Sequence, residues 1–415
     1  MLALALAALL APPTQVAVLT REAALQRFRE RGFDRVLADV QVEAARADAT
    51  SAGASPNPTL SGSVGRSFGY DAAQCPGCSA AQVGVGLSDN AALWDLVVGK
   101  KALRAAVAQA SVQAAQHNRD AALRTLTAAL LQQFYAAVQA ERLLAVAEGA
   151  RESSARTRAL LQRRFAAGAS SEVELARAEV QEMEALQARD QAQAQLGASR
   201  ATLGVLLGES GPLQEPLEAR ALDLGPLPAL DVESLAAQAQ AERPDVAAAQ
   251  AQLARARTAL SLARRQRIPD VAVSANYAQE GTGQGAIQPP TLTLGVSVPL
   301  PLFYQQQGEV ARAEADLRGA QVTLARARAQ AAADVRAAMA ALEAARSRAE
   351  RRVEERARRA RDLVQLQWEK GAASQLELLD AQRTLLQVSA EHLQDLTSYW
   401  MAVAQLELAT GKEIL

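Results

Sequence analysis

The stretch QWEKGAASQLELLDAQ, from Gln367 to Gln382, repeats a pattern that the chain has already used as QRRFAAGASSEVELARAE, from Gln162 to Glu179. Each copy has an aromatic residue, two further residues and a glycine. A short run of small residues follows, and then Glu and Leu begin an amphipathic segment. The same spacing of 203 residues separates Gly168 from Gly371 and Gly208 from Gly411. The two stretches therefore predict one chain reversal that is made twice.

The similarity between the two halves extends through the rest of the chain, with small changes in the offset between matching residues. The segment from Asp34 to Pro58 matches the segment from Pro244 to Asp270, and LWDLVVG at 93–99 matches LFYQQQG at 302–308. Landmarks that keep their order over this length indicate a duplicated unit. The expected organisation is a signal peptide at 1–17, a first repeat at 18–210, a linker at 211–230 that is rich in Pro and Gly, and a second repeat at 231–415.

The helical part of each repeat is unusually long. The run from Ala92 to Phe165 contains no proline and only two glycines, and at about 1.5 Å per residue it would reach on the order of 110 Å. In the return run, apolar residues recur every seven positions, which is typical of coiled-coil packing. These residues are Leu379, Leu386, Leu393 and Trp400, with Leu396 and Val403 beside them. Alanine-rich seams would let such helices pack closely on a second side, although the helices alone are also compatible with an ordinary antiparallel coiled coil.

Between the helical parts, each repeat contains two short segments that alternate apolar and polar residues, with a Gly-rich loop between them. Their expected bounds are about 59–70 and 81–89 in the first repeat and about 270–279 and 290–298 in the second. Alternation over about 9–11 residues is typical of tilted transmembrane strands, apolar outside and polar inside. Four strands are too few to close a barrel, and open edges are not tolerated in lipid. Membrane insertion would therefore require several copies; the alternative is a pair of solvent-exposed hairpins that cap a coiled coil.

Composition and charge narrow the function classes. Nearly half of the 415 residues are apolar, at 49%, but only 3% are aromatic, and the formal net charge is −1. There is no clustered basic face for nucleic acid, and the arginine-rich block from Arg351 to Arg361 alternates with glutamates, as expected for a solvated helix face. The apolar run MLALALAALLA at the N-terminus is too short to span a bilayer and resembles the core of a secretory signal.

The residues with reactive side chains are few. Cys75 and Cys78 have the spacing of a redox motif or half a zinc site, but no βαβ context surrounds them and a zinc site needs about four ligands. We therefore expect a small disulfide in an exported loop. His117 and His392 lie on helical stretches, and we expect them to be surface or packing residues. No nucleophile elbow, phosphate-binding loop or metal-ligand spacing is present, so the sequence predicts no enzyme, no cofactor and no metal site.

Taken together, the signal, short helix, Pro56-Asn57-Pro58, hairpin and long helical hairpin with a glycine turn, all repeated, resemble the outer-membrane efflux protein family, the TolC-like exit ducts. The VPLPLF run from Val298 to Phe303, which leads into Gly308, adds to the resemblance. It implies a mainly α fold with a small β part. Three copies would form an α-barrel that is continued by a twelve-stranded transmembrane β-barrel, in the outer membrane and reaching into the periplasm. The implied partners are a periplasmic adaptor, an inner-membrane pump of the RND type and outer-membrane lipid.

The resemblance also assigns roles to the two reversals. They would be the hairpin tips to which adaptor hairpins dock, and the carried-over positions are Arg164, Phe165, Gly168, Ser171, Trp368, Gly371 and Ser374. Inward-facing carboxylates just beyond the second tip would form an entrance constriction, here Glu377 and Asp380. In a ring of copies their mutual repulsion would raise some of their pKa values; alternatively they are an exposed acidic pair near a helix start. Where the family holds its tip shut with a tyrosine and an arginine, this chain has Trp368 and Ala373.

The segment from Val298 to Ala315 and the Ala- and Arg-rich composition look similar to the duct subfamily that serves pumps for heavy-metal cations. We therefore expect a passive duct for heavy-metal cations. Two alternatives stay open at this point: a multidrug or type I secretion duct of the same fold, and an elongated coiled-coil scaffold that does not enter a membrane.

Overall fold

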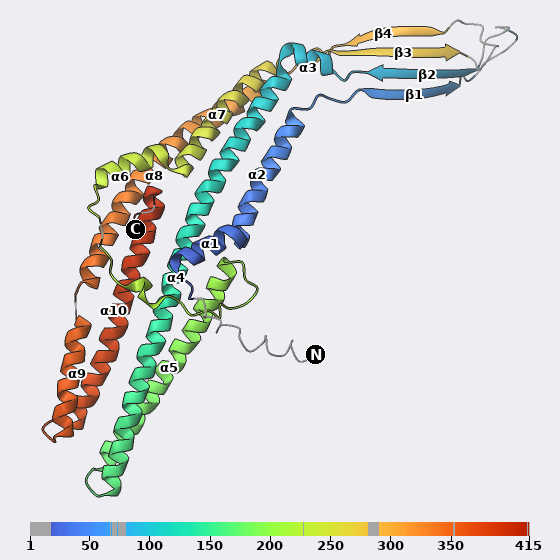
Figure 1. Ribbon diagram of the computed structural model, residues 1–415. Coiled ribbons are helices and arrows are strands. Elements are labelled where there is room, and N and C mark those ends of the chain that lie inside the picture. The colour runs from blue at the N-terminus through green and yellow to red at the C-terminus, as the bar shows by residue number, and fades with distance from the viewer. Residues whose placement is uncertain are drawn as a thin grey trace, which may run out of the picture. The chain divides into compact units, whose positions relative to one another are not determined.

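The computed structural model describes residues 18–66, 68, 73, 80–226, 228–280, 290–351, 353–412 and 414. They form a mainly helical chain with one small antiparallel sheet (Figure 1), which confirms the expected fold class at this level. The signal segment at 1–17 and the pair Cys75 and Cys78 lie outside the described residues, so both expectations remain predictions.

The same order of elements occurs twice along the chain. The first series is α1 (Arg21–Arg31), α2 (Phe33–Ala52), β1 (Thr59–Arg66), β2 (Ala81–Ser88), α3 (Ala92–Val98), α4 (Lys100–Ala166) and α5 (Glu172–Leu206). After the short 3-10 helix η2 (Ala219–Leu222), the second series is α6 (Val232–Glu242), α7 (Pro244–Arg265), β3 (Ala272–Glu280), β4 (Thr291–Ser297), α8 (Gln307–Ala349), α9 (Val353–Glu369) and α10 (Gln375–Thr410).

These elements fall into two compact units. The first contains the residues up to Val40, Asp120–Arg243 and the chain from Arg328 on; it holds the hairpin α9–α10 and, from Asp120 on, the hairpin α4–α5. The second contains Gln41–Arg119 and Pro244–Ala327, and it holds the whole sheet. Among the described residues, no helix combines the length and the apolar character that a membrane crossing requires.

The first long helical run is interrupted near its start, contrary to the sequence-based expectation of one helix from Ala92 to Phe165. Gly99 adopts the left-handed conformation with φ of 77°, and its N–H donates to the carbonyl of Asp95 at 3.1 Å. This is the usual way for a glycine to end a helix. Helix α4 then continues for 67 residues, or about 100 Å.

The second long run is also divided, and here neither glycine nor proline marks the position. Helix α8 ends at Ala349 and α9 begins at Val353. The N–H of Arg351 donates to the carbonyl of Arg348 at 3.1 Å, a bond between residues three apart, which tightens the last turn of α8. Local sequence preferences do not predict this break.

The sheet has the order β1-β2-β3-β4, with every neighbouring pair antiparallel (Figure 1). Its register places apolar side chains side by side on one face: Leu60 pairs with Leu87, Leu87 with Ala275, and Ala275 with Leu294. The large side chains of this face are exposed to solvent in the single chain, with Leu294 at 76% and Leu60 at 73%. The sheet therefore presents a continuous apolar surface that stays exposed among the described residues of its unit.

The opposite face of the sheet is made of small and polar residues. The ladder Ser61, Gly86, Asn276 and Thr293 runs across all four strands. A side chain at Gly86 would collide with Ser61 Oγ and Asn276 Oδ1, so glycine gives these polar groups their space. Strands β1 and β4 each have one neighbour, which leaves the sheet with two open edges.

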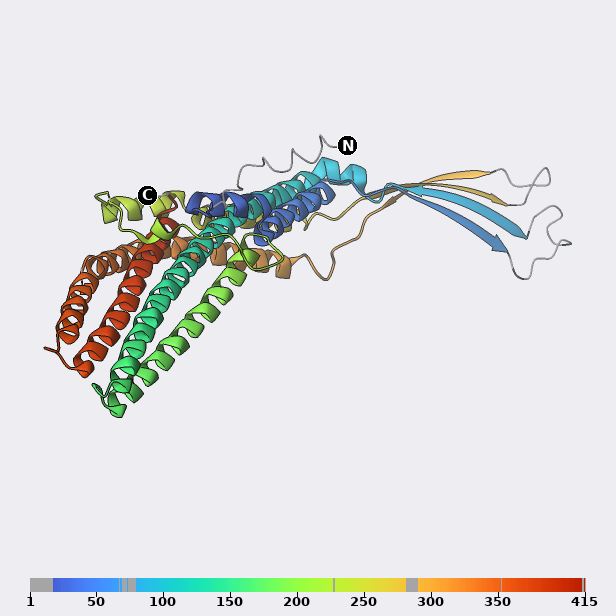
Figure 2. The same cartoon turned by 60° about the horizontal axis from the view of Figure 1, so that its bottom comes forward.

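In the unit that holds the two helical hairpins, α4–α5 and α9–α10 lie side by side (Figure 2). Far from the turns the contact is apolar: Phe134 and Tyr135 of α4 are almost fully buried, and the Tyr135 ring stacks on Trp400 of α10 with centroids 5.5 Å apart. Helix α1 is joined to α10 by Arg21, whose Nη2 donates to both carboxylate oxygens of Glu407 at 2.9 and 3.0 Å.

Candidate functional site: the two hairpin turns

Both hairpin turns close with the same backbone hydrogen bonds. In the first turn, the N–H of Gly168 donates to Phe165 and that of Ala169 to Arg164, at 2.9 and 2.8 Å. In the second, Gly371 donates to Trp368 at 3.0 Å and Ala372 to Gln367 at 2.8 Å. This pair of bonds is the Schellman motif, which requires a left-handed residue. Gly168 and Gly371 supply it, with φ of 67° and 76°.

The helices that leave the turns begin with matching capping boxes. Ser171 Oγ accepts from the N–H of Glu174 at 3.2 Å, and the Glu174 carboxylate accepts from the N–H of Ser171 at 2.9 Å. At α10 the pair is Ser374 and Glu377, with the corresponding distances 3.2 and 2.7 Å. A capping box satisfies two backbone donors that a helix start would otherwise leave without partners.

The capping bonds change the acidity of both glutamates. The backbone N–H of Ser374 donates to Glu377 and stabilises its charged form, which lowers the pKa of that carboxyl. The backbone N–H of Ser171, followed by the Ser170 hydroxyl, lowers the pKa of Glu174 in the same way. Within one protomer, therefore, Glu377 serves as a capping residue of α10. Asp380 lies one turn further along α10 and is exposed.

The aromatic residues of the two turns have different environments. Phe165 is 42% exposed, whereas Trp368 is only 7% exposed. Trp368 packs in an apolar cluster with Leu161 of α4, Ala178 of α5 and Leu378 of α10. The Arg164 guanidinium lies over its ring, 5.0 Å from the centroid, a cation–π contact. Trp368 thus joins the two hairpins near their turns, and its side chain reaches a docking partner only if the hairpins separate.

Polar contacts that sequence reasoning missed continue this junction. Gln375 Nε2 donates to the carbonyl of Glu174 at 2.8 Å, Gln382 Nε2 donates to Ser153 Oγ at 3.3 Å, and Arg383 pairs with Glu184 at 2.8 Å. A signal for them was present, because Gln375, Gln382 and Ser389 recur every seven residues on α10. The leucine heptad on the neighbouring face of α10 is the stronger pattern of the two.

Between the hairpins and close to these contacts lies a cavity of about 730 Å³, lined by α4, α5, α9 and α10. Small side chains such as Ala147 and Ala185 and polar ones such as Gln181 and Gln382 form its walls. The Oε1 atoms of Gln181, Gln375 and Gln382 are buried without a hydrogen-bond partner in the described part of the chain. Unsatisfied buried acceptors and empty space both cost stability. Both features therefore weaken the junction between the hairpins near the turns.

The described residues include no group of three or more His, Cys, Asp or Glu side chains arranged to hold a metal ion. His392 lies on α10 with Nε2 at 4.0 Å from a carboxylate oxygen of Glu354. Of the residues predicted for the site, those of the two turns are brought to one end of their unit. Glu377 and Asp380 lie at the start of α10, so a ring of these carboxylates would need further copies of the chain.

The chain is similar to known proteins over most of its length. The profile of the family described as "Outer membrane efflux protein" matches residues 24–209 and 235–412. The cobalt-zinc-cadmium resistance protein CzcC of Cupriavidus metallidurans is 25% identical over 401 residues, which are 95% of this chain and 90% of that protein.

Solved structures resemble the fold over nearly the full length. A CusC structure, from work on conformational changes during folding and transmembrane channel formation, has a TM-score of 0.76 at 19% identity and covers 94% of this chain and 92% of its own. The open state of the Neisseria gonorrhoeae MtrE outer membrane channel has a TM-score of 0.76 at 21% identity, with coverages of 95% and 89%.

Proposed function

Because the chain belongs to the outer membrane efflux protein family, we propose that it is the outer-membrane exit duct of a tripartite efflux pump. Three copies would enclose one water-filled passage that runs from the periplasm to the exterior. The duct is passive: an inner-membrane pump of the RND type supplies the energy, and a periplasmic adaptor connects pump and duct.

The observation that carries this proposal is the sheet. Its apolar residues are aligned in register on one face and exposed, its other face is polar, and both of its edges are open. An apolar outer face and a polar inner face suit a wall between lipid and water. Four strands cannot close a barrel, which takes about eight or more. Three copies would supply twelve strands and leave no open edge in the membrane.

The hairpin turns are the proposed docking surface for the adaptor. Phe165, Gly168 and Ser171 of the first turn and Gly371 and Ser374 of the second are exposed, and the small residues would let a helical hairpin approach closely. Arg164 and Trp368 hold the two turns together through their cation–π contact. We propose that these two residues set the spacing of the turns that the adaptor recognises.

Glu377 and Asp380 are the proposed acidic constriction at the periplasmic entrance. Both are exposed on α10, so three copies would place six carboxylates around one passage. Such a ring attracts cations. Repulsion among the copies would act against the capping bond that lowers the pKa of Glu377 within each protomer. Planar-bilayer recordings would test the ring: Glu377→Gln with Asp380→Asn should reduce cation selectivity, and unchanged selectivity would refute the assignment.

The proposed cargo is a heavy-metal cation, and the similarity to a protein named for cobalt, zinc and cadmium resistance supports it. A wide aqueous duct needs no metal ligands of its own, because the pump selects the cargo. The test is deletion of the gene in its native host. Sensitivity to cobalt, zinc or cadmium, restored by the wild-type gene, is the expected result.

Two outcomes would redirect the proposal. Sensitivity to hydrophobic drugs, or loss of a secreted protein, with unchanged metal tolerance would indicate a multidrug or type I secretion duct. Recovery of the protein in the soluble periplasmic fraction without detergent would indicate a coiled-coil scaffold that does not enter the membrane.

A further inference from the structure

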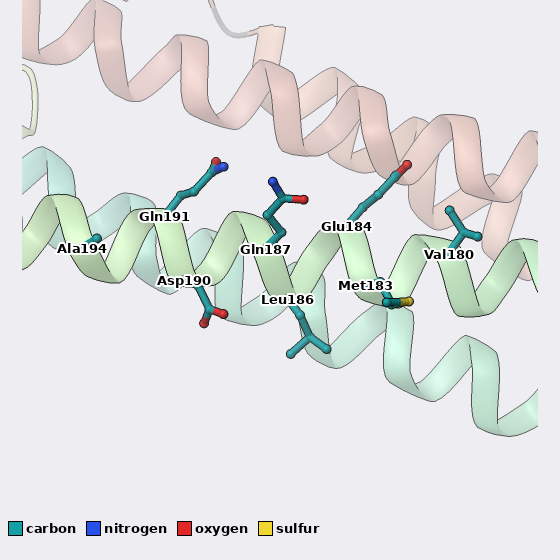
Figure 3. A pocket seen from close by; sticks show the side chains of 8 residues that line it. All are labelled: Val180, Met183, Glu184, Leu186, Gln187, Asp190, Gln191 and Ala194. Atoms are coloured by element: carbon teal, nitrogen blue, oxygen red, sulfur yellow. The ribbon is translucent and has the colours of Figure 1, made fainter.

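Helix α5 has an outward surface that no element of its own unit covers. Val173, Val180 and Met183 are exposed at 60%, 53% and 70%. They recur at intervals of seven and three residues, with Ala176, the acidic pair Glu172 and Glu179 and the exposed Arg177 beside them. Figure 3 shows the end of this surface that lies away from the turn: the labelled side chains all come from α5, and Val180 and Met183 are among those that line an open hollow. We use the name acidic stripe for the set Glu172, Val173, Ala176, Glu179, Val180 and Met183.

Helix α9 has a corresponding surface of opposite charge. Leu363 and Leu366 are exposed at 61% and 48%. Arg356, Arg359 and Lys370 lie at the same helical spacing and are also exposed. We call these five residues the basic stripe. Inward-facing Trp368 lies on the other side of α9, so the basic stripe points away from the protomer's own hairpin junction.

The charges on the two stripes are available for new partners. In the described part of the chain, neither Glu172 nor Glu179, nor any of the three basic side chains, forms an ion pair within the protomer. The neighbouring acids of α9 are engaged instead: Asp362 lies 2.9 Å from Arg361, and Glu369 accepts from Gln365 at 3.2 Å. An exposed leucine pair flanked by free cations thus matches an exposed valine and methionine surface flanked by free anions.

The chain direction brings matching positions to the same level. Helix α5 leaves a turn and α9 arrives at one, and Gln375 of the second turn bonds to the carbonyl of Glu174 in the first, so both turns lie at similar height. Counted from the turn glycines, Val173 and Leu366 are both five residues away, and Ala176 and Leu363 both eight. Glu179 is eleven residues beyond Gly168 and Arg359 is twelve before Gly371. An antiparallel pair of stripes from two copies would therefore align leucine with valine and alanine, and arginine with glutamate.

We propose that the acidic stripe of one copy docks on the basic stripe of the next copy, with ion pairs Glu179–Arg359 and Glu172–Lys370. The stripes differ from each other, so the contact is heterologous and generates a closed ring when the rotation between copies is one third of a turn. Like charges would oppose α5–α5 and α9–α9 contacts between copies. This inference rests on the proposed trimeric duct and names the contact that determines its geometry.

Cross-linking of the full-length protein in detergent tests the contact. In a background with Cys75→Ser and Cys78→Ser, the double variant Ala176→Cys with Leu363→Cys should oxidise to a covalent trimer on a non-reducing gel. Each single variant should yield no cross-linked species. A covalent dimer from Ala176→Cys alone would show an α5–α5 contact and would overturn the proposal.

Charge reversal tests the ion pairs with the same cross-link as readout. Glu172→Lys with Glu179→Lys should lower the yield of covalent trimer roughly tenfold, because like charges then meet across the interface. Adding Arg359→Glu with Lys370→Glu should restore the yield. The control Glu148→Lys with Glu152→Lys reverses two exposed acids of α4 outside both stripes and should leave the yield unchanged.

The outcomes separate this inference from the proposed function. A wild-type protein that is trimeric by light scattering, but whose double-cysteine variant gives no covalent trimer, would refute the stripe contact and leave the duct standing. A wild-type protein that is monomeric in detergent would refute both.

Discussion

At the residue scale, replacing a glycine by alanine should have opposite effects on stability in a turn and inside a helix. Gly371 has φ of 76° with open space around it, and Gly149 lies inside α4, also with open space. Space does not limit either position, so backbone conformation alone decides the effect of an added methyl group.

We expect Gly371→Ala to destabilise the protein by about 1–2 kcal/mol, because an L-residue is strained in the left-handed region. Gly149→Ala should stabilise it by roughly 0.5–1 kcal/mol, because alanine favours a helix interior. Thermal melting of the detergent-solubilised protein by circular dichroism checks both. Shifts of the same sign for the two variants would contradict the backbone argument.

The capping carboxylate of Glu377 makes the second turn sensitive to acid. The folded-state pKa of Glu377 is below its ordinary value of 4.5. The stabilisation by the charged carboxylate is therefore fully present at neutral pH and is lost as the pH falls through the folded-state pKa.

We expect Glu377→Gln to melt at a lower temperature than the wild type at pH 7. The difference should shrink as the pH falls below 4.5 and the wild-type carboxyl becomes protonated. Melting curves recorded between pH 7 and pH 3 measure this. Asp380→Asn is the matched control, since no capping bond involves Asp380. A constant difference between Glu377→Gln and wild type over the whole range would contradict the capping role.

At the element scale, the two hairpins contact each other through a graded junction. Tyr135 and Trp400 form its apolar end, whereas Gln375, Gln382 and the cavity form its polar end, where Trp368 belongs to a small apolar cluster. The hairpins should therefore separate more readily near the turns than far from them.

We expect Trp368→Ala to cost about 3–5 kcal/mol, as for other buried aromatic residues. Phe165→Ala, at the equivalent position of the first turn, should cost under about 1 kcal/mol because its ring is largely exposed. Hydrogen exchange of the backbone of α9 and the start of α10 would report the loosening. Equal exchange in the two variants would show that Trp368 does not join the hairpins.

The ion pair between α1 and α10 offers a second test at this scale. The side chains of Arg21 and Glu407 are 16% and 10% exposed and bond through two oxygens. Arg21→Met should cost about 3–5 kcal/mol, because it leaves a buried carboxylate without its partner. Combining Arg21→Met with Glu407→Met should recover much of that loss in a double-mutant thermal cycle. Additive losses would indicate that the two side chains are not energetically coupled.

The elements differ in how far the sequence predicts them. Alternation alone places Val273, Tyr277, Leu292 and Leu294 on one face of the sheet, because the strand period is fixed at two residues. The glycine turns and their capping glutamates are also readable, because both depend on neighbours within a few residues. The burial of Trp368 depends on contacts with α4, α5 and α10, and a local pattern does not predict contacts between distant segments.

At the scale of the whole molecule, the single chain leaves two kinds of surface exposed that further copies of the chain could cover. The sheet leaves two open edges and an uncovered apolar face, and the hairpin unit leaves two stripes of opposite charge. A heterologous ring of three identical copies would satisfy both, since it closes the edges of the sheet and pairs each acidic stripe with a basic one. The proposed constriction follows the same logic, because Glu377 and Asp380 would form a ring only if several chains surrounded one axis.

The most direct test of this account is the number of copies in the particle that mild detergent extracts from the outer membrane, measured by native mass spectrometry. The account predicts three copies of the chain in one particle, with a β-sheet contribution in the circular dichroism of the same sample. A particle that contains one copy, extracted intact and folded, would contradict it.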